Sequence, residues 1–403
     1  MTAHHPPRET PERVVGLEAT TRRRNSAQAD AVVTLLTAGD PLADAVIAEL
    51  DILGPRARQA LDAGLRHGLA GLGERPPEAV AALLKQVETP PPRIDPLLPH
   101  RGDAVSLSVP PMWFGLCSIT SALTYVHASP AVARRLPRTD RPADMATRGL
   151  AETAAWARQT IRPGGLLRGG PGQMATVQIR LRHARMRARS LQEWDTGVSG
   201  LPVGQLDMAR TWLGFTLVAF QALAAVGIDT TPDEERRLYQ YWSYVAHLLG
   251  LDERLWKGVT DHAGARRLRN LLDTMTPAPD ENSTALTATM VDAQARAMAA
   301  APGAVLSEDQ LRALIHSVLR RTFGENTADR LGIPLAATTD LLPLIGKLNR
   351  EARYWQTFSP ASAGEARRRA LAGPGPELIS AVLPSPTANR RPAWADHSGV
   401  PAA

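Results

Sequence analysis

Residues 178–187 read Gln-Ile-Arg-Leu-Arg-His-Ala-Arg-Met-Arg, which places one histidine, His183, among four arginines. The segment around them has the composition and spacing of a helix. A histidine nitrogen binds iron and guanidinium groups pair with carboxylates, so the combination suits a doubly anionic, metal-bearing group such as haem. Taken alone, the spacing favours a plainer interpretation, a solvated arginine-rich helix face with an incidental histidine. Both interpretations stay open at this point.

Helical patterns continue on both sides of this segment. No stretch alternates apolar and polar residues as a strand would, and no internal repeat or glycine-rich phosphate loop occurs. We therefore predict an all-α fold. Helical periodicity, with caps and glycine or proline breaks, predicts helices at residues 29–53 with an interruption near 39–41, 57–72, 77–87, 112–127, 147–160, 173–189, 203–226, 235–249, 261–275, 281–300, 307–323, 325–331 and 338–357.

The length and composition predict one large helical domain. The chain has 403 residues, of which 44% are hydrophobic, enough for a sizeable core. We expect a flexible N-terminal arm at residues 1–28, a helical catalytic domain at 29–365 and a loose C-terminal tail at 366–403.

The net charge of +6 does not predict a nucleic-acid partner. Only three of the 46 basic residues are lysines, which indicates a coding bias toward arginine. The arginines are interspersed with acidic residues in most segments, whereas nucleic-acid binding needs a clustered basic face with aromatic residues.

Cysteine and apolar content predict the compartment. Cys117 is the single cysteine, so no disulfide forms within the chain. The arginines at 22–24 precede an apolar run too short for an export signal. The most apolar stretch, residues 113–126, is shorter than the roughly 20 residues that span a bilayer. We expect a cytoplasmic protein without a membrane span.

His247 is the second histidine of interest. It lies near the end of an apolar helix, where we expect a core histidine bonded to a nearby carbonyl. A second axial ligand to a haem is the alternative. No His-Glu-x-x-His motif occurs, and no two histidines are four residues apart, so a zinc hydrolase site is not predicted.

Several stretches together resemble the latex-clearing-protein (rubber oxygenase) and MpaB-type haem oxygenase family. The resemblance covers roughly residues 40–360 and rests on the order and spacing of its parts. These parts are residues 40–45, 150–153, 177–187, 194–195, 200–208, Trp242 with 247–251, and 323–334.

The resemblance implies an all-helical fold with a globin-like core that binds haem b. It implies that His183 is the proximal iron ligand and that Thr153 stands where the family has a threonine on the opposite, distal side. Cations near His183 would neutralise the haem propionates. The candidates for this role are Arg180, Arg182, Arg185 and Arg187.

The distal side implied for this chain departs from the pattern of the rubber-cleaving members of the family. They have an arginine four residues before the threonine and a lysine directly before it. This chain has Gly149 and Glu152 at those places, with Arg148 one position away. We expect Arg148, Glu152 and Thr153 to be the catalytic side chains, with Glu152 in an apolar pocket as the acid or base in place of the lysine.

The resulting hypothesis is a haem b-dependent oxygenase that uses O2. Its substrate would be apolar, such as an isoprenoid alkene cleaved oxidatively at C=C, or a related natural product. The alternative is a non-catalytic haem-binding or haem-sensing protein. A helical interaction domain without a cofactor is the third interpretation.

Overall fold

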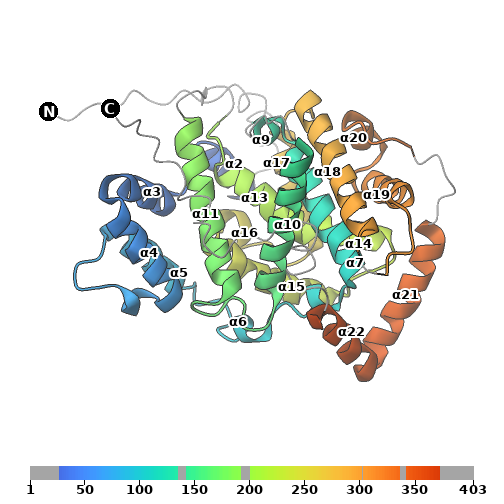
Figure 1. The fold of residues 1–403 in the computed structure, drawn as a ribbon, viewed down its shortest axis with the longest axis horizontal. Coiled ribbons are helices and arrows are strands. Elements are labelled where there is room, and N and C mark those ends of the chain that lie inside the picture. The colour runs from blue at the N-terminus through green and yellow to red at the C-terminus, as the bar shows by residue number, and fades with distance from the viewer. Residues whose placement is uncertain (1–26, 135–141, 192–199, 302, 336–341, 373–403) are drawn as a thin grey trace.

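A computed structural model of the chain describes residues 27–134, 142–191, 200–301, 303–335 and 342–372. These residues form helices joined by turns, with no strand among them (Figure 1). The prediction of a single all-α domain is confirmed for the described part. None of the described helices is long and apolar enough to cross a membrane.

The helices follow the predicted order. The larger ones are α2 (Ala27–Leu35), α3 (Pro41–Leu53), α4 (Pro55–His67), α5 (Glu78–Glu88), α10 (Pro142–Ile161), α11 (Pro171–Ser190), α15 (Pro232–Leu248), α17 (His262–Thr274), α18 (Glu281–Ala299), α19 (Glu308–Phe323), α21 (Leu342–Phe358) and α22 (Pro360–Ala372). Short helices lie between them: η1 (Leu69–Gly71), α6 (Leu98–Arg101), η2 (Ser106–Ser108), α9 (Pro130–Ala133), α16 (Glu253–Trp256) and α20 (Glu325–Arg330).

Local caps explain where the helices begin. Asp40 precedes α3, its side chain accepts a hydrogen bond from the Ala43 amide at 3.2 Å, and Pro41 occupies the first turn. Thr231 and Glu234 form a reciprocal capping box at the start of α15. Both signals are visible in the sequence, although α15 begins at Pro232, before the predicted start at 235.

Two apolar helices differ from the prediction. Residues 111–127 form α7 (Pro111–Trp113), the π-helical segment η3 (Phe114–Thr120) and α8 (Ser121–His127). Residues 205–225 form α13 (Gln205–Leu213), the π-helical segment η4 (Gly214–Val218) and α14 (Ala219–Ala225). A wider turn interrupts each predicted regular helix, and the two helices pack against each other along these turns.

The long helix α11 lies between two groups of helices (Figure 1). Helix α10 packs along one side of it and in turn contacts α18, while α3 covers α11 on the other side and is backed by α5. Helix α15 packs against α11 as well. The arginine-flanked histidine is thus carried by a helix whose sides are held by elements from distant parts of the chain.

The C-terminal end differs from the predicted boundary. Helix α22 continues to Ala372, past residue 365, where the tail was expected to begin. The remainder of the predicted tail and most of the predicted arm lie outside the described residues, as do residues 194–195 of the family resemblance.

Candidate functional site

The four arginines around His183 each contact a carboxylate of the chain. Helix α11 projects them in different directions, because a helix turns by about 100° per residue. The pairs are Arg180–Asp40 at 2.5 Å, Arg182–Glu152 at 3.0 Å, Arg185–Asp51 at 2.6 Å and Arg187–Asp44 at 2.6 Å. Their predicted contacts with propionates remain predictions, and the burial of each pair decides how easily it is exchanged.

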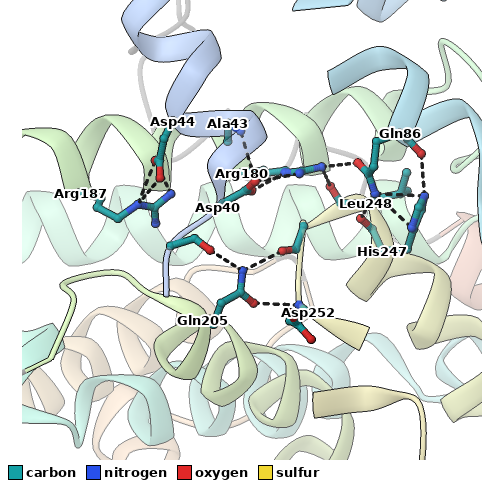
Figure 2. A network of polar contacts seen from close by, with 12 residues as sticks. Asp40, Ala43, Asp44, Gln86, Arg180, Arg187, Gln205, His247, Leu248 and Asp252 are labelled. Carbon is teal, nitrogen blue, oxygen red and sulfur yellow. Dashed lines mark hydrogen bonds and ion pairs between the residues drawn. The ribbon is translucent and has the colours of Figure 1, made fainter. Parts of the chain in front are cut away.

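Arg180 forms the most buried of these pairs. Its Nε donates to Asp40 Oδ2 at 2.5 Å and its Nη2 donates to Oδ1 at 2.9 Å, a bidentate geometry. Its Nη1 donates to Gln86 Oε1 at 2.6 Å (Figure 2). The Arg180 side chain is 3% exposed. A charge so deeply buried is tolerated only because it is paired and hydrogen-bonded.

Arg187 is held in a similar way by Asp44, which lies one turn after Asp40. Its Nε donates to Asp44 Oδ1 at 2.9 Å, and its Nη1 donates to the carbonyl of Val203. The Arg187 side chain is buried, although Asp44 is partly exposed. Arg180 and Arg187 therefore fasten α11 to α3 through two carboxylates that lie four residues apart on the same helix.

The other two arginines have exposed carboxylate partners, although the Arg185 side chain itself is only 18% exposed. The side chains of Arg182 and Glu152 are 43% and 49% exposed, and Asp51, the partner of Arg185, is 56% exposed. Such pairs contribute little to stability because water screens them. Arg182 and Arg185 can exchange their carboxylate for another anion at low cost, whereas Arg180 and Arg187 cannot.

The predicted apolar surroundings of Glu152 are wrong. Its carboxylate is exposed and accepts from Arg182, and Arg148, one turn earlier on the same face of α10, is exposed too. Thr153 is half-buried. Residues 148 and 152 share the outer face of α10 because they are four apart, a consequence that the apolar-pocket prediction overlooked. The catalytic roles of the three side chains remain predictions.

Two polar links hold α10 and α11 together. The Trp156 indole donates to Thr176 Oγ1 at 2.9 Å, and Arg182 bonds to Glu152 two turns further along α11. The two links show that α10 and α11 run antiparallel, and they bring Glu152, predicted for the distal side, into contact with Arg182 of the histidine helix.

His183 has a feature that a structural histidine lacks. Its Nδ1 atom is buried and has no hydrogen-bond partner among the described residues. Burial, then the positive charges of Arg182 and Arg187, lower its pKa to about 4. The imidazole is therefore neutral at pH 7, the form that binds metals. An unsatisfied buried polar atom costs about 1–3 kcal/mol, which a ligand would offset.

The donor set fits a haem rather than a bare metal ion. Within the described ranges no three His, Cys, Asp or Glu side chains converge. A porphyrin supplies four nitrogens of its own, so that one protein nitrogen is enough to hold its iron. The neutral, unpartnered His183 provides that nitrogen, and the exchangeable arginines beside it provide cations.

His247 is a satisfied core histidine, as predicted. Its Nε2 lies 2.9 Å from the carbonyl oxygen of Gln86, and the Gln86 amide donates to the His247 carbonyl at 3.1 Å (Figure 2). Burial lowers the pKa of His247 to about 4 despite the bond to Gln86. Its ring nitrogens contact Gln86 and its ring stacks on Tyr244. The alternative of a second axial ligand stays a prediction.

Several residues of this network were not singled out from the sequence. Gln205 donates to the carbonyls of Gly39 and Gly250 at 2.9 and 3.0 Å, and the Asp252 amide donates to its Oε1 at 2.8 Å (Figure 2). Gly250 has a φ of 72°, and a Cβ there would lie 2.4 Å from Arg180 Nε. The sequence does contain one relevant signal: Asp40 and Asp44 lie four residues apart at the start of a helix, a spacing that would let each bind one cation.

A recess lies at the end of α11 near Arg187. Its position follows from Gly39: a Cβ there would lie 3.1 Å from Arg187 and 3.1 Å from Leu201, which lines the recess. Glu152, Thr153 and His183 do not line it. Its described lining consists of Leu36, Ser129, Ala131, Leu201, Leu206, Asp207, Arg210, Leu272, Met275 and Thr276.

Comparisons with known proteins agree with this arrangement. A family model described as ER-bound oxygenase mpaB/B'/rubber oxygenase, catalytic domain, matches residues 104–357, which include α10 and α11. The structure of Latex Clearing Protein LCP in the closed state is similar, with a TM-score of 0.60, over 85% of this chain and 90% of that one. At 20% identity this likeness concerns the fold alone. No curated protein matches the chain.

Proposed function

Because the chain belongs to the family of mpaB/B' and rubber oxygenase catalytic domains, we propose that it is a haem b-dependent oxygenase. We propose an apolar substrate, such as an isoprenoid alkene or a related natural product. The observation that carries this proposal is His183, whose buried Nδ1 has no partner. A neutral imidazole with an unpartnered ring nitrogen, near cations, is an environment that an iron porphyrin would complete.

The arginines divide into two groups in this proposal. Arg182 and Arg185 would neutralise the propionates, because their present carboxylate partners are exposed and easily replaced. Arg180 and Arg187 would position α11, because their pairs are buried and tie it to α3. This assignment narrows the sequence prediction, which treated the four arginines alike.

When bound, haem would supply an iron atom for the activation of O2. In the net reaction the C=C bond of the alkene breaks and each carbon takes one oxygen atom of O2, giving two carbonyl groups without a further reductant. Release of Arg182 to a propionate would free the Glu152 carboxylate, which could then take or give a proton beside the Thr153 hydroxyl.

A product assay tests this function. The haem-loaded protein is incubated with O2 and cis-polyisoprene or a short isoprenoid alkene, and carbonyl products are captured with a hydrazine reagent and identified by mass spectrometry. We expect products that carry a carbonyl group at each former alkene carbon. In a parallel sample made with ¹⁸O₂ and reduced at once with borohydride instead of hydrazine, each resulting alcohol should carry one ¹⁸O atom. Haem-loaded protein that consumes no O2 with any alkene would support the non-catalytic alternative instead.

A further inference from the structure

Helix α21 exposes its apolar side chains to solvent. Five large residues along one side are between 56% and 69% exposed. Tyr354 contacts both Trp355 and Phe358, so the aromatic rings form a continuous surface. We call these five residues the α21 stripe: Leu344, Leu348, Tyr354, Trp355 and Phe358.

The opposite side of α21 attaches the helix to the protein through polar contacts. Asn349 donates to the Val226 carbonyl at 2.7 Å, and Arg353 pairs with Glu234 at 2.8 Å. Gly346 packs closely on Gly227: a Cβ added to Gly227 would lie 2.3 Å from the Gly346 carbonyl oxygen. A surface helix normally turns its apolar face inward. Leu342 and Ile345 also pack inward, so the stripe is a second apolar face of α21 that points outward. An exposed apolar surface of this kind indicates that something outside the described chain covers it.

The charge around the stripe identifies what covers it. Residues 342–372, which contain α21 and α22, hold six basic and two acidic residues. Arg353 pairs with Glu234 on the inward side of α21, so the rest of the segment carries a net charge of +3. Lys347 and Arg350 are exposed beside the stripe and have no acidic partner among the described residues. Glu351 is the one acidic side chain within α21. The surface is thus both apolar and strongly cationic.

We propose that α21 and α22 dock on an anionic lipid surface. Tyr and Trp side chains prefer the boundary between headgroups and acyl chains, and a neighbouring cationic face adds attraction to anionic lipid. A second copy of the chain fits less well, because a two-fold interface along the stripe would bring the exposed Lys347 and Arg350 of both copies together. This inference is independent of the haem and of the proposed reaction.

Vesicle co-sedimentation of the full chain tests this proposal. We expect binding to vesicles of equal parts phosphatidylglycerol and phosphatidylcholine, weakened by salt, and much less binding to phosphatidylcholine alone. The double variant W355A/F358A should bind about tenfold more weakly or worse, because two large apolar groups are lost. K347E/R350E should lose the preference for anionic vesicles.

The matched control is Ile52→Ala, which removes a side chain that is 81% exposed on α3. It should leave vesicle binding unchanged. Absence of binding to anionic vesicles, or equal binding by W355A/F358A and the unmodified chain, would overturn the proposal. So would a stable dimer in sedimentation velocity that W355A/F358A converts to a monomer, since the stripe would then be covered by a second copy.

Discussion

Replacing Arg180 by alanine is expected to lower the free energy of unfolding by about 3–5 kcal/mol, because it leaves a buried carboxylate without its counter-charge. Asp40 is 8% exposed, so water cannot replace the guanidinium. The substitution also removes the donor to Gln86, which bonds His247 in turn. Proteins of this kind are stable by only about 5–15 kcal/mol, so the loss is a large fraction of the total.

Urea denaturation followed by circular dichroism measures this loss. Arg236→Ala is the control, because Arg236 pairs with Asp233 at the surface, and we expect a change of at most about 1 kcal/mol. If R180A does not fold, the double variant D40N/R180Q keeps the hydrogen-bonding groups without burying a charge and should recover part of the stability. An R180A protein as stable as R236A would show that the pair does not fasten α11.

Replacing His183 by alanine is expected to abolish stoichiometric haem binding while the fold is kept. The His183 Nδ1 is unpartnered, so its removal costs no hydrogen bond among the described residues. Haem titration of the purified protein, followed at the Soret band, measures the effect. Added imidazole should restore the band in part by filling the space that the ring leaves.

The matched variants for this experiment are Arg182→Ala and Arg185→Ala. Each removes one cation from an exposed pair, and we expect haem to bind about tenfold more weakly with an unchanged Soret maximum. This contrast separates the iron ligand from the propionate cations. An H183A protein with full haem content and an unchanged spectrum would contradict the assignment of His183.

Local signals in the sequence predicted much of the fold. The Asp40-Pro41 start of α3, the capping box at Thr231 and the glycine after α14 each act within a few residues, so their effect on the backbone is visible in the sequence. The π-helical segments of the two apolar helices were not predicted, because they adjust the packing of neighbouring helices and leave no local mark. Helix α22 was missed because residues 360–372 carry no regular apolar pattern.

The site was predictable only in part, for a related reason. His183 and its arginines are adjacent in sequence, and their chemistry can be inferred from residue type. The carboxylate partner of each arginine cannot be inferred in this way, because Asp40 lies 140 positions from Arg180 and four carboxylates compete for four guanidinium groups. The exposure of Glu152 depends on which face of α10 meets α11, and periodicity left that face undecided.

The most direct test is the absorption spectrum of the purified wild-type protein, supplied with haem and reduced with and without CO. Haem held by His183 with an open opposite face predicts a Soret band at one haem per chain that shifts when CO binds. A protein that shows no Soret band even after haem is supplied would contradict the central claim. A low-spin spectrum that does not respond to CO would contradict the open face and favour a haem-binding protein without oxygenase activity.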